Sequence, residues 1–105
     1  MAKYLLLWEM DMSRLPVDPQ ERLAGEIKLL TMIKGDLESG RLKDWGVFPG
    51  GNAGYAIMEG TDQDVLLGAE KYTPYAKFKA STVLSIDQAW ATHNTAKAQF
   101  AAAKK

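Results

Sequence analysis

The chain has 105 residues, with thirteen basic side chains, thirteen acidic side chains and no cysteine. This length is typical of one domain, and the balanced charge argues against binding to nucleic acid or to an anionic membrane surface. The lack of cysteine excludes disulfides, thiolate catalysis and cysteine-ligated metals, and it fits a reducing compartment, so we expect a cytoplasmic protein.

The first predicted element is a strand over Lys3–Met10. Tyr4, Leu6 and Trp8 alternate with Leu5 and Leu7, so both faces of this strand are apolar, which is typical of a central strand. Acidic residues at positions 9 and 11 make the apolar run too short for a signal sequence or a membrane span. We therefore expect a buried strand and no membrane association.

A helix is predicted over Pro19–Ser39, after a loop at Asp11–Val17. Asp18 is a favourable N-cap, proline follows at the first helical position, and Gly40 suits the left-handed C-terminal position. The apolar residues that recur at helical spacing are Leu23, Ile27, Leu30, Ile33 and Leu37.

Two strands follow, over Leu42–Phe48 and Tyr55–Glu59, joined by the turn Pro49–Gly54. The turn is rich in glycine and asparagine, which tolerate positive φ, so we expect a β-hairpin. It lacks the lysine and the following helix of a phosphate-binding loop, and the turn interpretation is favoured.

The remaining elements are a helix beginning at Thr61–Asp64, a strand over Lys77–Leu84 and a final helix beginning near Ser85 or Asp87. Charged outward residues predict that the fourth strand lies at the edge of its sheet. The last helix carries Ile86, Trp90, His93 and Phe100 on one side. We expect this side to pack over the chain's own sheet edge or on a partner.

This order, β-α-β-β-α-β plus a C-terminal helix, predicts an α+β fold of the ferredoxin-like, split-βαβ type with an antiparallel-type sheet of strand order 4-1-3-2. Residues 1–105 are expected to form one domain, with 87–105 as a helical extension. Both helices would cover one face of the sheet. Because the other face is also apolar, we expect a second copy to cover it, giving a homodimeric α+β barrel. The aliphatic character of that face speaks against RNA binding.

The chain resembles the muconolactone isomerase-like proteins of the dimeric α+β barrel superfamily over roughly Tyr4–Leu84. The resemblance lies in the layout of the segment Gly54–Glu59, then Asp62, Asp64, Leu66 and Leu67, then Pro74, Tyr75 and Phe78. It implies a homodimer, sometimes assembled further, with a pocket between the sheet and its helices. Members include isomerases, cofactor-independent monooxygenases and heme-degrading enzymes. The longer C-terminal helix, Asp87–Lys105, departs from the isomerases and would cover the pocket or exchange onto the partner.

Glu9 and Glu59 are the candidate catalytic residues, because they end the first and third strands. We expect these two strands to be parallel neighbours, which would place both carboxylates at one edge of the sheet. Two close carboxylates raise one pKa and create an acid–base pair for proton abstraction next to a carbonyl. The alternative is that each glutamate is solvated or paired with a lysine at its strand end.

Trp8, Trp45 and Tyr55 are candidate ligand-binding residues, because aromatic side chains can line a pocket for a small planar molecule. They are equally suited to a core or an interface. His93, the only histidine, is a further candidate. On an apolar helix face it can be a packed residue, or a heme ligand of the kind that heme-degrading relatives use.

No histidine pair, cysteine or carboxylate-rich loop has metal-ligand spacing, and we expect no metal site and no cofactor. Three functions remain open from the sequence. The first is the binding or isomerisation of a small planar or enolisable molecule. The second is a non-catalytic structural or interaction homodimer, and the third is a heme-binding or heme-degrading protein.

Overall fold

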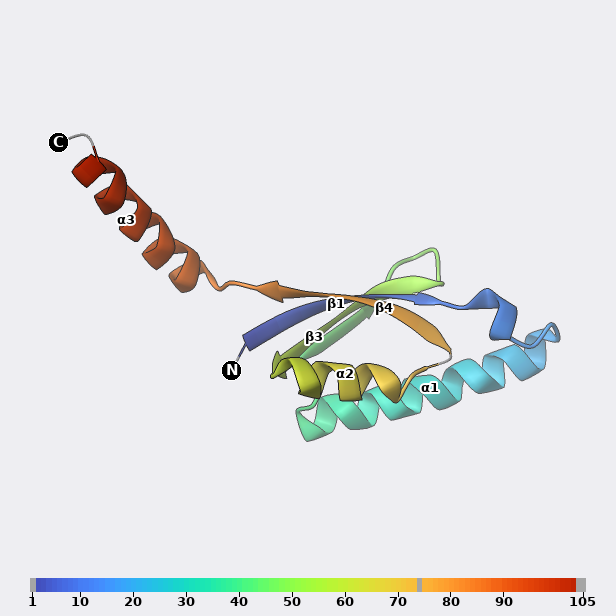
Figure 1. Cartoon of the computed structure of the whole chain (residues 1–105). Coiled ribbons are helices and arrows are strands. Elements are labelled where there is room, and N and C mark those ends of the chain that lie inside the picture. Colours follow the sequence, from blue (N-terminus) through green and yellow to red (C-terminus); the bar gives the residue numbers. More distant parts are fainter. Residues whose placement is uncertain (1, 74, 104–105) are drawn as a thin grey trace.

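The computed structural model describes residues 2–73 and 75–103, which form four strands and three α-helices in an α+β arrangement (Figure 1). In chain order the elements are β1 (Ala2–Met10), a 3₁₀ turn (Met12–Arg14), α1 (Pro19–Ser39), β2 (Asp44–Val47), β3 (Ala53–Gly60), α2 (Asp62–Glu70), β4 (Ala76–Val83) and α3 (Ile86–Ala103). The predicted β-α-β-β-α-β-α order is confirmed, and the bounds of α1 are those predicted.

The four strands form one open sheet of order β2-β3-β1-β4, in which every neighbouring pair is antiparallel. The predicted order and the edge position of β4 are confirmed. The expectation that β1 and β3 run parallel is wrong. The crossover through α1 sets β2 parallel to β1, and the hairpin after β2 then reverses the chain, so β3 must run against β1.

Side-chain caps fix where each helix begins. The Asp18 carboxylate accepts the backbone N–H of Glu21 at 3.1 Å. Thr61 and Asp64 exchange two hydrogen bonds in a capping box at the start of α2. At α3, the Ser85 hydroxyl accepts the N–H three residues on at 3.1 Å. Such caps satisfy N–H groups that a helix leaves unpaired, and each contributes about 1 kcal/mol.

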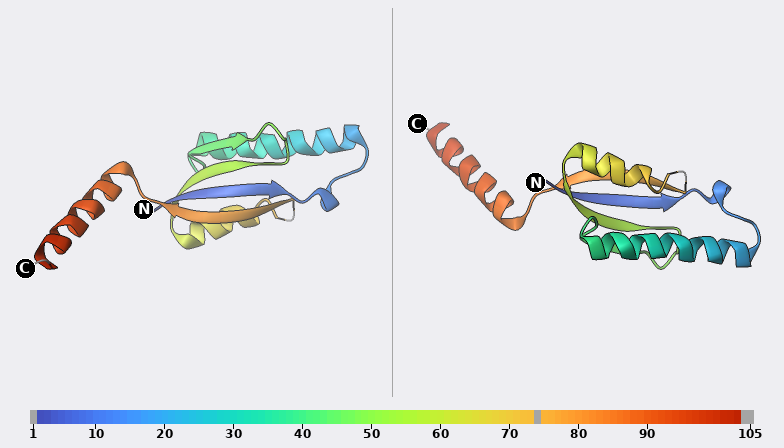
Figure 2. Two further views of the ribbon diagram at one scale, coloured as in Figure 1. Left: turned by 90° about the horizontal axis from the view of Figure 1, so that it is seen from above. Right: turned by 90° about the horizontal axis from the view of Figure 1, so that it is seen from below.

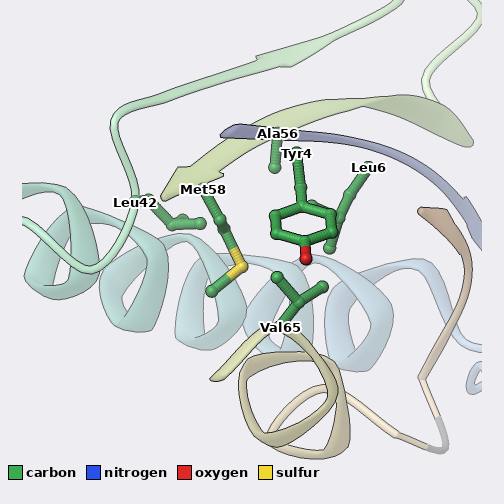
Figure 3. Close-up of a cluster of buried hydrophobic side chains, with 6 residues drawn as sticks. All are labelled: Tyr4, Leu6, Leu42, Ala56, Met58 and Val65. Atoms are coloured by element: carbon green, nitrogen blue, oxygen red, sulfur yellow. The ribbon is translucent and has the colours of Figure 1, made fainter. Parts of the chain in front are cut away.

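The core lies between one face of the sheet and the helices α1 and α2 (Figures 1 and 2). Its buried members are Tyr4, Leu6, Leu42, Ala56, Met58 and Val65, which meet beneath β1 and β3 (Figure 3). The phenolic OH of Tyr4 donates a hydrogen bond to Asp62, which ties β1 to the first turn of α2. The face of the sheet that α1 and α2 leave uncovered is called the open face below.

The helix α3 stands away from the rest of the chain and makes no extensive contact with another element (Figure 1). The described residues consequently extend 69 Å along the longest axis, against 26 and 22 Å along the others. Trp90 and Phe100 are 69% and 71% exposed. The expectation that α3 packs over its own sheet edge is therefore wrong, and its packing on a partner stays a prediction.

Among the described residues, no helix is both long enough and apolar enough to cross a lipid bilayer.

Candidate functional site: a groove between the sheet and its helices

A largely apolar groove of about 910 Å³ runs between the sheet and the helices α1 and α2. Its floor is formed by the sheet residues Leu6, Trp8, Trp45, Ala56, Met58 and Phe78. Leu29 and Ile33 of α1 form one wall, and Leu67 and Tyr72 near α2 form the other. The two helices lie along the same face of the sheet (Figure 2). A volume of this size suits a small organic molecule, since such pockets typically measure roughly 300–1,000 Å³.

Two tryptophans stack on the floor of the groove. The rings of Trp8 and Trp45 have centroids 5.4 Å apart and planes 8° from parallel. The indole N–H of Trp8 donates to the backbone oxygen of Tyr55 at 3.2 Å, so this polar atom is satisfied and the ring is fixed in direction. The stack offers a flat apolar surface against which a planar ligand can lie.

Two glycines allow close packing around the groove, one beside Trp8 and one between α2 and β3. A Cβ added at Gly54 would lie 2.4 Å from a ring carbon of Trp8, so the indole can pack against β3 at this point only because the position carries no side chain. A Cβ at Gly68 of α2 would lie 2.8 Å from the terminal methyl of Met58. The helix α2 can therefore approach β3 closely at this point, which narrows one side of the groove.

A buried carboxylate lies at one end of the groove. Asp36, in the last turns of α1, is only 7% exposed. Its two oxygens accept hydrogen bonds from the ammonium group of Lys71 at 2.7 Å and from the hydroxyl of Tyr72 at 2.6 Å. Arg41 also borders the groove. The hydrogen bonds of Asp36 connect the C-terminal turn of α1 with Lys71 and Tyr72, which directly follow α2.

The charges of this cluster are set by its environment. Burial alone would raise the pKa of Asp36, but hydrogen bonds from Lys71 and Tyr72, with the positive charges of Lys71 and Arg41, hold it below its ordinary value. Burial, and then the hydrogen bond to Asp36, raise the pKa of Tyr72 far above its ordinary value. At neutral pH the aspartate is therefore ionised and the tyrosine is protonated.

Tyr55, the third predicted aromatic residue, belongs to the open face. Tyr55 is paired with Leu7 of β1 and Gly46 of β2, which are the sequence neighbours of Trp8 and Trp45. Because successive side chains of a strand point to opposite faces, Tyr55 lies on the face opposite to the two tryptophans. Its ring lies across Gly46, where an added Cβ would be 2.3 Å from a ring carbon, and its hydroxyl donates to Asp44 at 2.8 Å. The structure thus brings two of the three predicted aromatic residues together in the groove.

The antiparallel sheet places Glu9 and Glu59 at its opposite ends. Glu9 is opposite Ala53 on β3 and Lys77 on β4, whereas Glu59 is opposite Lys3 on β1. The two positions are six residue steps apart along β1, which corresponds to about 20 Å. Both glutamates are exposed, and each lies opposite a lysine across the strands. The predicted pair of adjacent carboxylates is therefore not formed, and only Glu59 borders the groove.

His93 lies on α3, away from the groove. Its ring nitrogen Nδ1 is 2.7 Å from the carbonyl oxygen of Ala89, one turn earlier in the helix. The shallow hollow beside it is lined by residues of α3 alone, among them Lys97 and Phe100. A heme is normally enclosed on both faces of its ring, whereas the hollow beside His93 is bounded on one side only, by α3. Within the described ranges there is also no cluster of three or more His, Cys, Asp or Glu side chains able to hold a metal ion.

Sequence reasoning missed Asp36, Lys71 and Tyr72 as site residues. One signal was available, because Asp36 stands three residues after Ile33 and so falls within an apolar helical row. A charged residue in such a row is either exposed or paired. Nothing in the sequence connects it with Lys71, which is 35 residues away.

No model of a known protein family matches the chain, and no curated protein is similar to it in sequence.

Proposed function

We propose that this protein binds a small, planar and largely apolar molecule in the groove, as part of a ferredoxin-like homodimer of the muconolactone isomerase-like kind. The observation that carries the proposal is the apolar groove of about 910 Å³, with the stacked Trp8 and Trp45 in its floor. A flat apolar surface beside a few directed polar groups is the usual composition of a small-molecule site.

The polar end of the groove defines the expected ligand further. Both carboxylate oxygens of Asp36 already accept hydrogen bonds, so this group has little left to offer a ligand. Lys71 has three N–H donors and uses one on Asp36, and Arg41 brings a guanidinium group to the same region. We therefore expect a ligand that carries a carbonyl or carboxylate oxygen at one end of its ring system.

Binding fits the site better than acid–base catalysis. Glu9 and Glu59, the residues expected to transfer protons, lie at opposite ends of the sheet. In the groove, the pKa of Asp36 is lowered and that of Tyr72 is raised, so neither group exchanges protons readily near neutral pH. Isomerisation by a pair of adjacent carboxylates consequently has no geometric support.

Leu66 and Leu67 of α2 provide a matched test of the groove. Both are exposed, but only Leu67 borders the groove. We expect Leu67→Trp to weaken ligand binding at least tenfold, because the larger ring covers the mouth of the groove. Leu66→Trp adds the same ring outside the groove and should bind as the wild type does.

The measurement is thermal unfolding in the presence of planar lactones, enones and aromatic carboxylates. A ligand present at 100 times its dissociation constant stabilises the folded state by about 2.7 kcal/mol, or roughly 10 °C in a domain of this size. Binding is then titrated by isothermal titration calorimetry, whose signal does not depend on the tryptophans that the two leucine variants add. If no compound raises the melting temperature, or if both leucine variants bind equally, the groove is not a binding site.

A second candidate function, an interaction protein that works as a homodimer, rests on the open face. Its centre carries the apolar residues Leu5, Leu7, Tyr55 and Ile57 on the adjacent strands β1 and β3. Leu7 is 45% exposed in the single chain. Antiparallel sheets that face water normally show polar residues at such positions.

The charges around the open face suit a second copy of the same chain. Lys77 and Lys79 lie on this face at the β4 edge, with Glu9 of β1 opposite Lys77, and Asp44 lies on it at the β2 edge. A two-fold axis along the strands would lay β4 of each copy over β2 of the other, so that basic and acidic edges meet. The same axis would lay β1 over β3 and close two open sheets into a barrel-like sandwich. This interface is compatible with ligand binding, because the groove lies on the other side of each sheet.

A further inference from the structure

The helix α3 has one apolar side that stays exposed among residues 2–73 and 75–103. We call the exposed residues Ile86, Trp90 and Phe100 the α3 stripe. They recur at helical spacing, with His93 and Lys97 on the same side between the last two. The opposite side of the helix carries Gln88, Thr92, Thr95 and Gln99. An amphipathic helix of 18 residues is about 27 Å long, and its apolar side needs a partner surface to be stable in water.

The direction of α3 indicates where that partner surface lies. Figure 1 shows α1 and α2 on one side of the sheet, whereas α3 rises from the end of β4 toward the opposite side. That is the side of the open face. Only Leu84 and Ser85 separate β4 from α3, and the Ser85 cap fixes the first turn. A second sheet laid on the open face would therefore lie beside α3.

We propose that α3 is an arm that packs its stripe against a second copy of this chain. This inference rests on the homodimer through the open face proposed above, and it adds a second contact region to it. Each copy would place its α3 across the end of the partner's sheet, at the end where β1 begins and β3 ends. The arrangement is reciprocal, as a two-fold axis requires.

The surface that the stripe would bury fits this role. Trp90 and Phe100 are 69% and 71% exposed, and a two-fold dimer contains two of each. At roughly 150–250 Å² per aromatic side chain, these four exposed portions supply about 400–700 Å². A stable dimer buries roughly 1,200–2,000 Å² in total, so the arms provide between about a fifth and a half of it and the open faces the rest.

A membrane surface is a poorer partner for the stripe. Helices that lie in a lipid interface carry lysine or arginine along their polar side. Here the polar side has the uncharged residues Gln88, Thr92, Thr95 and Gln99. The net formal charge of the chain is also zero, which gives no attraction to anionic lipids.

The test uses the full chain and charge substitutions on the two sides of α3. Trp90→Glu with Phe100→Glu places two charges in the stripe, and Thr95→Glu with Gln99→Glu places two on the polar side. Neither pair should disturb the fold, because α3 makes no extensive contact with another element in the described part of the chain. Far-UV circular dichroism and unfolding at a concentration where the protein is monomeric check this point.

Sedimentation equilibrium then measures the dimer dissociation constant. We expect the stripe variant to dimerise at least 30-fold more weakly than the wild type, and the polar-side variant to change by less than threefold, since buried aromatic residues dominate interfaces. In the wild type, Trp90 should also become protected from iodide quenching as the dimer forms.

Three outcomes overturn the inference. If the wild type dimerises and the stripe variant has the same dissociation constant, α3 does not contribute to the interface, although the homodimer through the open face is retained. A chain that is monomeric at 100 µM refutes the homodimer and the arm together. Sedimentation of the wild type with phosphatidylcholine–phosphatidylserine vesicles, lost in the stripe variant, would assign the stripe to a lipid surface instead.

Discussion

Replacing Leu7 with lysine is expected to convert the homodimer to folded monomers. Leu7 lies in the middle of the open face, opposite Tyr55 on β3 and Lys79 on β4. In a dimer closed over this face, the new ammonium groups of both copies would lose their water without gaining a counter-ion, and a buried unpaired charge costs several kcal/mol. We expect the dissociation constant to rise by about 1,000-fold or more.

The monomer should tolerate this change. Leu7 is 45% exposed in the single chain, so a lysine there can keep its charge in water. Leu66→Lys makes the same substitution on the outside of α2 and serves as the control, with no expected effect on dimerisation. Sedimentation equilibrium measures the dissociation constants, and urea unfolding of the monomers compares stability. Equal dissociation constants for the two variants would rule out an interface on the open face.

Element order and helix limits could be predicted from the sequence because local chemistry determines them. The start of α1 follows from Asp18 and the proline after it, and its end follows from Gly40, which adopts a φ of +83°. The hairpin follows from the turn between β2 and β3, where Gly51 has a φ of +87°. Each of these signals acts within a few residues, so no knowledge of the tertiary structure was needed.

The inward side of α1 could not be predicted in the same way. The apolar row chosen from the sequence includes Leu23 and Ile27, which are 56% and 61% exposed. Of that row, Leu30 and Ile33 do border the groove. So do Glu26, Leu29 and Asp36, each of which lies one position earlier in the helical repeat than a member of the chosen row. The helix has two apolar rows side by side, and periodicity alone does not say which one faces the sheet. The polar cluster at Asp36 was missed for this reason.

The error over Glu9 and Glu59 has a different origin. The direction of β3 follows from the order of the elements, because a crossover helix and then a hairpin leave β3 antiparallel to β1. The two glutamates end strands that run in opposite directions, so they had to lie apart. For α3, by contrast, the sequence predicted an amphipathic helix correctly but carried no signal for where it packs.

Lys71→Met is expected to lower the free energy of unfolding by about 2–3 kcal/mol at neutral pH. The variant keeps a side chain of similar length but leaves the Asp36 carboxylate, 7% exposed, with the hydroxyl of Tyr72 as its hydrogen-bond donor and the charge of Arg41 nearby. Removing one member of a buried ion pair costs roughly 3–5 kcal/mol, and the partial exposure of Lys71, 34% of its side chain, reduces that figure. Equilibrium urea unfolding measures the loss.

Asp36→Asn is the matched variant, and it should cost less. Its amide oxygen can still accept the hydrogen bond from Tyr72, and the ammonium group of Lys71 can turn toward water. In the double variant, Lys71→Met should cost much less than in the wild type, because the carboxylate that it would strand is absent. Additive losses would mean that Lys71 stabilises the fold through contacts other than Asp36.

The contribution of Asp36 to stability should also depend on pH in a defined direction. Its pKa in the folded chain lies below the value of about 3.9 for an unfolded aspartate, so the unfolded state binds the proton more readily. The stabilisation is therefore fully present above about pH 4–5, and it is lost as the pH falls toward and through the lowered folded pKa. The asparagine variant has no proton to bind at this position. The difference in unfolding free energy between the wild type and Asp36→Asn should shrink steadily as the pH falls below 4. A difference that stays constant from pH 7 to pH 2.5 would show that the carboxylate is not held ionised by Lys71 and Tyr72.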